Sequence, residues 1–190
     1  MQSMLTSTLM GFLLFSGTSS IGTLQKLGGM LSSLPAGQVY SVSVTGYNAV
    51  ADQTDSEPFI TASGAYSNPD IVVARSVDLA DELPFGTVIE IAPSAATSTP
   101  NCGLSVIGPF IGLRVVADSM NPRKRNQIDI LFDSDVSERV GGKHMNPATT
   151  LGFCKDVDIR VVGRVNIAKM PRSQIELAGA IGQAKLAFRN

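Results

Sequence analysis

Short runs of β-branched and alternating apolar residues recur along this 190-residue chain, and clusters of Gly, Pro, Asn and Asp separate them. Few helical patterns interrupt these runs, so the sequence predicts a mainly β domain. Closing the sheet into a barrel would remove its exposed edge strands. We therefore expect a six-stranded barrel with short helices around it. The predicted strands are Val39–Tyr47, Asp70–Arg75, Thr87–Ala92, Gly112–Asp118, Gln127–Phe132 and Val157–Val165.

Three short helices are predicted between and after these strands. Ser76 can cap the first of them, and a Gly-Gly pair at positions 141–142 can end the second. The third is rich in Ala, Leu and Ile and begins with a capping-type serine. The predicted helices are Val77–Leu83, Asp135–Val140 and Ser173–Phe188, and the longer predicted loops are Pro93–Asn101 and Val140–Thr150.

The N-terminal segment contains a mostly apolar run, Met4–Phe15, before the first charged residue, Lys26. Its length suits the apolar core of a signal peptide and falls short of the roughly 20 residues that a membrane-spanning helix needs. No Lys or Arg precedes it, so a buried amphipathic helix or a start codon placed too late stays open as an alternative. We expect residues 1–37 to be an export signal or membrane-contacting anchor with a linker, 38–168 the β domain, and 169–190 a C-terminal helix.

Charge and cysteine content limit the classes of partner. The formal net charge is -1, so no basic surface is expected to recruit nucleic acid. The sole histidine, His144, lies in a polar loop and the cysteines form no CxxC pair, so neither a metal nor another cofactor is expected. If the protein is exported, Cys102 and Cys154 are predicted to form a disulfide. A monomer is expected.

The segment Val115–Phe132 holds the residues that most suggest chemistry. Two predicted strands flank a polar, strongly basic loop, and each strand carries an aspartate where an apolar residue would be expected. Alternation along the second strand puts Ile128 and Ile130 on one face and Asp129 on the other. Asp118 ends the preceding strand, so the loop could fold back and bring the two carboxyl groups together in one surface groove.

This arrangement resembles the 3D domain, a double-psi β-barrel that is named for three aspartates and shared with the membrane-bound lytic murein transglycosylase A family. In that family a D-[TS]-x segment is followed eleven residues later by the aspartate of a strand reading [IF]-D-[IL]-[FY]. Asp118-Ser119 and Ile128–Phe132 match that spacing. Further pieces follow in the family's order within Val39–Val165: Thr45-Gly46-Tyr47 for TGY, Thr61-Ala62-Ser63-Gly64 for TA-x-G, and Val73-Ala74 with Leu83–Thr87 for VA…PLGT.

The chain departs from the family pattern at several positions. Arg75-Ser76 occupies the place where the family's first aspartate closely follows the VA pair. Asp78 or Asp81 could substitute for it, and the sequence does not choose between them. Met120 stands where the family has glycine, and Phe85 where it has leucine.

The resemblance implies a lytic transglycosylase that cleaves the MurNAc–GlcNAc bond of peptidoglycan outside the cytoplasm, with the glycan strand as its partner. Asp129 would protonate the glycosidic oxygen and then, as a base, take the proton of the MurNAc 6-hydroxyl. Asp118 would orient Asp129 or raise its pKa by repulsion. The alternative is a non-catalytic wall-binding or expansin-like wall-loosening module. Substrate contacts are expected from Thr45, Tyr47, Thr61, Gly64, Ser119 and Arg123.

Overall fold

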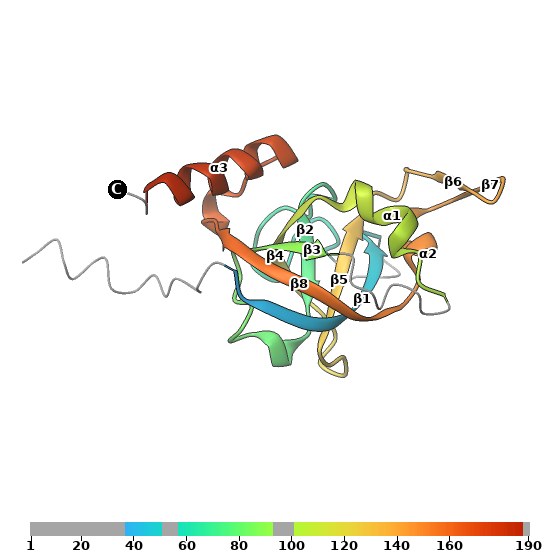
Figure 1. Ribbon diagram of the computed structural model, residues 1–190, viewed down its shortest axis with the longest axis horizontal. Coiled ribbons are helices and arrows are strands. Elements are labelled where there is room, and N and C mark those ends of the chain that lie inside the picture. Colours follow the sequence, from blue (N-terminus) through green and yellow to red (C-terminus); the bar gives the residue numbers. More distant parts are fainter. Residues whose placement is uncertain (1–36, 51–56, 93–100, 188–190) are drawn as a thin grey trace, which may run out of the picture. The chain divides into compact units, whose positions relative to one another are not determined.

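The computed structural model describes residues 37–50, 57–92 and 101–187 (Figure 1). The predicted export segment, most of the Pro93–Asn101 loop and Phe188 lie outside the described residues. Within the described ranges, no helix is both long enough and apolar enough to cross a bilayer.

Six strands form one closed barrel in the order β1-β5-β2-β4-β3-β8, with β1 also paired to β8. Each lies within a few residues of a predicted strand, so the prediction of a mainly β fold with six strands is confirmed. Their bounds are β1 Val39–Asn48, β2 Val72–Arg75, β3 Thr87–Ala92, β4 Leu113–Ser119, β5 Gln127–Phe132 and β8 Cys154–Arg164.

Two of the neighbouring pairs are parallel, β1 with β5 and β2 with β4, and the other neighbours are antiparallel. Parallel neighbours cannot be joined by a tight hairpin, so the chain must cross over between them. As a result, strands that are distant in the sequence, such as β1 and β5, lie side by side (Figure 1).

The interior of the barrel is filled mainly by β-branched side chains, which pack well on a pleated surface. Along β5 the two isoleucines belong to this core, whereas Leu131 belongs to a separate cluster on the outer face, the face that Asp129 shares. The predicted alternation of β5 is therefore confirmed. The fully buried β-branched residues that the barrel strands contribute to this core include Val44, Val73, Ile89, Val116, Ile128, Ile130, Val157, Ile159 and Val161.

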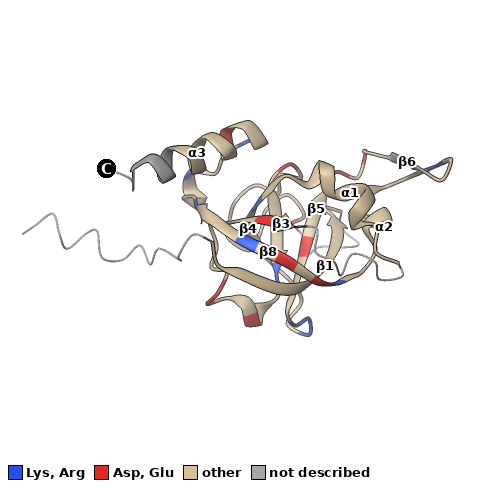
Figure 2. Ribbon diagram, viewed as in Figure 1, with Lys and Arg blue, Asp and Glu red and all other residues tan. Residues whose placement is uncertain are grey.

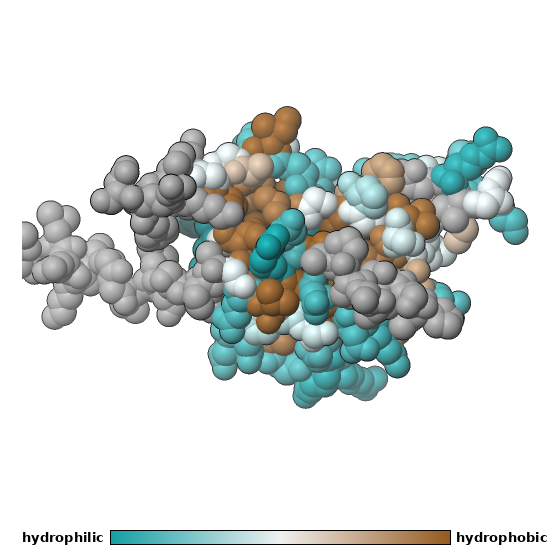
Figure 3. All heavy atoms as spheres, viewed as in Figure 1, coloured by the Kyte–Doolittle hydropathy of each residue, from teal (hydrophilic) through white to brown (hydrophobic). Residues whose placement is uncertain are grey.

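Helices cover the barrel in two places. Buried side chains of α1 (Leu104–Ile111) and α2 (Pro147–Leu151) join the barrel core. The predicted C-terminal helix is present as α3 (Gln174–Ala187), and it packs on the outer surface through Leu177 and Ile181. Apolar surface remains exposed between α3 and the barrel, whereas the loops at the bottom of the view are hydrophilic (Figure 3).

The predicted helix Asp135–Val140 is wrong. Its second half is a strand, β6 (Glu138–Val140), that pairs antiparallel with β7 (Lys143–Met145). Gly141 and Gly142 both have positive φ, 57° and 83°, as a tight two-residue hairpin turn requires. The Gly-Gly pair therefore makes a hairpin turn and does not end a helix.

The helix predicted at Val77–Leu83 is only a 3-10 turn, η3 (Val77–Leu79), and Ser76 makes no side-chain cap. The Ser76 hydroxyl instead accepts a hydrogen bond from the backbone N–H of Gln127, 3.1 Å away, at the start of β5. A second short 3-10 helix, η5 (Ile167–Lys169), follows β8.

Two helices were not predicted. The sequence of α1 contains Gly108 and Pro109, which are poor helix formers, in its second half. Burial of its apolar face is therefore what favours the helix. The other, α2, lies in the predicted Val140–Thr150 loop. Asn146 caps it by accepting a hydrogen bond from the Ala148 N–H at 2.9 Å, and Pro147 occupies the first helical position.

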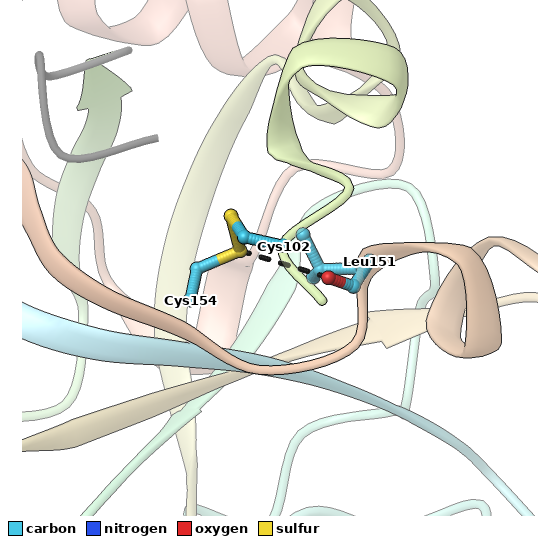
Figure 4. Close-up of a disulfide and its surroundings, with 3 residues drawn as sticks. All are labelled: Cys102, Leu151 and Cys154. Atoms are coloured by element: carbon cyan, nitrogen blue, oxygen red, sulfur yellow. Dashed lines mark hydrogen bonds between the residues drawn. A yellow bond between two sulfur atoms is a disulfide. The ribbon is translucent and has the colours of Figure 1, made fainter. Parts of the chain in front are cut away.

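The predicted disulfide is present between Cys102 and Cys154, whose Cα atoms are 4.8 Å apart (Figure 4). Cys102 precedes Gly103, the residue that caps α1, and Cys154 is the first residue of β8, so the bridge joins these two elements. Cys154 Sγ lies 3.6 Å from the carbonyl oxygen of Leu151. The bridged residues are 52 positions apart. On the chain-entropy model, closing a loop of that length stabilises the fold by about 4 kcal/mol.

Candidate functional site

A groove of about 500 Å³ lies on the outer face of the barrel, where β1, β5, β2 and β4 run next to one another. Tyr47, Ala74, Asp118 and Asp129 line it from these four strands. A loop before β2 and the loop between β4 and β5 complete its walls. The residues that these two loops contribute are Pro58, Ile60, Ser67, Met120, Asn121 and Lys124, together with Ser119 at the end of β4.

Asp118 and Asp129 flank Ala74. In the β2–β5 pair Ala74 is opposite Asp129, and in the β2–β4 pair it is opposite Asp118. Residues that are paired across strands present their side chains on the same face of a sheet. Both carboxyl groups therefore emerge on the outer face, and the small side chain of Ala74 leaves the space between them open.

A β-bulge in β4 directs Asp118 to this face. Val73 pairs with Val116, but the next residue, Ala74, pairs with Asp118, so Ala117 is an extra residue in the strand. Val116 belongs to the barrel core, and strict alternation from it would point Asp118 inward. The bulge resets the alternation and brings Asp118 to the same face as Asp129.

Asp129 is largely buried in the wall of the groove. The Thr45 hydroxyl, on the neighbouring residue of β1, donates a hydrogen bond to Asp129 Oδ1 at 2.8 Å. The side-chain amide of Gln127 in turn donates to the Thr45 oxygen at 2.8 Å. Among the described residues, no hydrogen bond reaches Asp129 Oδ2, which is therefore available to a ligand.

Burial raises the pKa of Asp129 to about 6 from 3.8, because removing the carboxyl from water disfavours its charged form. The Thr45 hydrogen bond and the Lys124 ammonium lower this pKa, and the charge of Asp118 raises it. Asp118 was expected to raise this pKa by repulsion, and its charge does act in that direction, but burial is the larger cause.

Asp118 is held by three donors. Its Oδ2 accepts a hydrogen bond from the Tyr47 hydroxyl at 2.9 Å, and its Oδ1 accepts from the backbone N–H groups of Ala62 (2.9 Å) and Ser119 (2.8 Å). Burial and the nearby Asp118 charge raise the pKa of Tyr47, so its hydroxyl stays a donor. With both oxygens engaged, Asp118 is suited to fixing neighbouring groups in place.

The predicted substrate residues separate into two sets. Tyr47 and Ser119 line the groove, and Thr45 contacts Asp129. Thr61, Gly64 and Arg123 do not line it. The Thr61 hydroxyl is buried and donates to the Ala65 carbonyl at 3.1 Å, and Gly64 has a φ of +81° in the same turn. Arg123 is exposed.

The basic loop between β4 and β5 is visible at the bottom of Figure 2. From the sequence we predict that its cationic side chains, Arg123, Lys124 and Arg125, point outward, away from the site. Lys124 instead lines the groove and acts electrostatically on Asp129. Nothing in the sequence distinguishes Lys124 from Arg123 and Arg125, because the turn that orients them depends on Asn121. The backbone carbonyl of Asn121 accepts a hydrogen bond from the Lys124 N–H at 2.9 Å, and its side chain accepts one from the Arg123 N–H at 3.0 Å.

Neither candidate for a third aspartate lies in the groove. Asp78 is engaged elsewhere, since its Oδ2 accepts a hydrogen bond from the Asn126 N–H at 2.9 Å, and Asp81 does not line the groove. Arg75, at the place of the missing aspartate, is buried and turns to the Leu83 carbonyl at 2.9 Å and the ring of Phe85.

The site therefore contains one carboxyl group of raised pKa, one fully hydrogen-bonded carboxyl group and a lysine. Within the described ranges, no three His, Cys, Asp or Glu side chains are grouped as a metal site would need. The arrangement is suited to proton transfer to and from a ligand in the groove. No protein-family model matches the chain, and a comparison with curated proteins also finds no match.

Proposed function

We propose that this protein is a lytic transglycosylase of peptidoglycan, with Asp129 as its single acid and base. The observation that carries the proposal is a carboxyl group with a pKa of about 6 in the wall of an open groove. At pH 7 a group with that pKa is protonated about 10% of the time, roughly a hundredfold more than an unperturbed Asp. A general acid needs this protonated population.

The reaction needs only one carboxyl group. Protonated Asp129 gives its proton to the glycosidic oxygen as the bond from MurNAc C1 to that oxygen breaks. The MurNAc O6 then bonds to C1, and the Asp129 carboxylate takes the proton that O6 loses, which restores the acid. No water is consumed, so the carboxylate spacing of hydrolases does not apply. In this scheme Asp129 Oδ2 transfers the proton, while Thr45 holds Oδ1.

The proposed architecture is the double-psi barrel of the 3D domain. Supporting it are the six strands in a closed circuit and the two parallel pairs, β1–β5 and β2–β4. The family-like pieces also converge around one groove. Thr45 and Tyr47 come from the TGY-like piece, and Asp118 and Asp129 come from the two aspartate pieces.

We further propose that the protein is exported and acts as a monomer in the periplasm, the cell wall or outside the cell. The Cys102–Cys154 disulfide supports export, because such bonds persist in oxidising compartments and are rare in the cytosol. The apolar run Met4–Phe15 has the length of a signal-peptide core.

The test is incubation with purified peptidoglycan and mass spectrometry of the soluble products. We expect anhydro-muropeptides from the wild type, and at least about 100-fold less from Asp129→Asn, which keeps the shape of the side chain but loses the titrating proton. Asp158→Asn is the matched control. Asp158 is also a half-buried strand aspartate, but it lies on β8 outside the groove, so this variant should cleave like the wild type.

A non-catalytic wall-binding or wall-loosening module is the second candidate. The buried Arg75, at the place of the family's first aspartate, and the absence of Asp78 and Asp81 from the groove favour it. Binding of the wild type to peptidoglycan without any anhydro product would replace the first proposal with this one. Cleavage by Asp129→Asn at the wild-type rate would show that Asp129 is not the catalytic residue.

A further inference from the structure

One wall of the groove is a short hairpin-like loop, residues 57–67, that precedes β2. Ile60 and Tyr66 form an isolated antiparallel bridge, and the Ser67 N–H donates to the Phe59 carbonyl at 2.9 Å. The Thr61 N–H donates to the Ala65 carbonyl at 2.8 Å, which closes the turn. The backbone of this loop is therefore internally hydrogen-bonded and can hold side chains in fixed positions.

The loop is fastened to the strand that carries one of the two carboxyl groups. The Ala62 N–H donates to Asp118 Oδ1 at 2.9 Å, and the Ser63 N–H donates to the carbonyl of Ala117, the bulged residue, at 3.1 Å. These two bonds set the position of the loop relative to β4. Side chains on the loop are thus fixed relative to Asp118 and to the groove.

Three large apolar side chains are exposed on this loop: Phe59 (62%), Ile60 (46%) and Tyr66 (62%). Exposed apolar side chains grouped at the rim of a groove often mark a binding surface. Ile60 lines the groove, and Tyr66, its bridge partner, lies beside it on the same face of the loop, at the rim and not among the lining residues. Phe59 neighbours Ile60 in the chain, so alternation places it on the opposite face.

We propose that Tyr66, with Ile60, forms a stacking platform for a sugar ring of the glycan strand next to the bond that is cleaved. The C–H groups on one face of a pyranose ring carry partial positive charge and complement the negative face of an aromatic ring. The hydroxyl of Tyr66 can bond to a sugar hydroxyl, and among the described residues it has no hydrogen-bond partner. A tyrosine also loses little conformational entropy on binding. This inference rests on the proposed peptidoglycan substrate.

The experiment measures co-sedimentation with insoluble peptidoglycan in the Asp129→Asn background, so that cleavage does not disturb the binding curve. Tyr66→Ala should weaken binding about 3- to 10-fold, the range expected for loss of an aromatic stacking contact. Tyr66→Phe keeps the ring and should change binding by less than about 2-fold, on the same reasoning. Phe59→Ala removes an equally exposed aromatic from the opposite face and should bind like its parent.

Unchanged binding of Tyr66→Ala overturns the platform, as does equal weakening by Phe59→Ala, since that would indicate a general loss of apolar surface. Both side chains are largely exposed, so neither change should unfold the protein, and thermal melting confirms this for each variant. The readout is binding alone. If the wild type cleaves peptidoglycan but Tyr66→Ala binds normally, the platform is wrong and the proposed activity stands. If Tyr66→Ala loses binding selectively but the wild type gives no anhydro product, the platform stands and the proposed cleavage is wrong.

Discussion

Asp118 and Asp129 pair with the same residue, Ala74, from the two sides of β2. One intervening strand separates them, so their Cα atoms are about 10 Å apart, twice the spacing between neighbouring strands. At that separation the repulsion between the two carboxylates is modest in a site open to solvent. The raised pKa of Asp129 consequently depends mainly on burial.

We expect Asp118→Asn to reduce activity less than Asp129→Asn does. The change removes a charge that raises the pKa of Asp129, so this pKa falls and the acidic form survives only to lower pH. The pH optimum of peptidoglycan cleavage should therefore move to lower pH, by less than about one unit because burial remains. A pH profile of product formation measures it, and a shift to higher pH would contradict the prediction.

Thr45→Val should move the pH profile in the opposite direction. The Thr45 hydrogen bond lowers the pKa of Asp129, so removing it lets this pKa rise. The amide of Gln127 also loses its acceptor inside the protein, which costs about 1–3 kcal/mol of stability. The control is Thr61→Val, which removes another buried threonine hydroxyl outside the groove. It should destabilise the fold without moving the profile.

Asp129→Asn should make the protein more stable at neutral pH. The pKa of Asp129 is raised in the folded state, so below about pH 4 the carboxyl is protonated in both states and costs nothing. Between about pH 4 and pH 6 the unfolded state ionises this carboxyl while the folded state keeps it protonated, so the free energy of unfolding falls, by up to about 3 kcal/mol once the pH is above 6. The asparagine avoids this cost. In urea unfolding, the variant should have a higher free energy of unfolding than the wild type at pH 8 and the same value near pH 3.5. A gain in stability that does not depend on pH would refute the raised pKa of Asp129.

Gly46→Ala should destabilise the protein, although the residue lies between two residues of the site. A Cβ at Gly46 would lie 2.8 Å from Phe132 Cε2 and 2.9 Å from the Cα of Ala148, where α2 packs against β1. Relieving these contacts costs about 1–3 kcal/mol. Gly182→Ala in α3, where a Cβ meets open space, should instead be neutral or stabilise by up to about 1 kcal/mol. Thermal melting compares the two.

The outward position of Asp129 could be predicted from the sequence because alternation along β5 is regular. The outward position of Asp118 could not be derived in the same way, because it results from a bulge at Ala117. That bulge is set by the pairing of β4 with β2. The loop before β2 was expected on the wall of the groove, but through Thr61 and Gly64, and the residues of this segment that do line the groove were missed for a related reason. Pro58, Ile60 and Ser67 belong to an irregular segment with no strand-like period, and only its attachment to β4 brings it to the site.

The errors in the fold come from local patterns with more than one solution. The Gly-Gly pair at 141–142 is compatible with a helix end and with a hairpin turn, and only pairing of β6 with β7 decides between them. In α1, burial of Leu104, Ile107 and Ile111 against the barrel overrides the low helix propensity of Gly108 and Pro109. Tertiary packing, which a single sequence does not display, determined each of these elements.

The Cys102–Cys154 bridge makes a covalent ring of the intervening chain, and that ring contains both Asp118 and Asp129. The exposed basic loop between β4 and β5 lies within the same ring and presents sites at which trypsin-like proteases cut. A single cut in that loop opens the ring but releases no fragment, because the disulfide still joins the two pieces. The proposed catalytic strands thus stay in one molecule after a cut that would otherwise separate them.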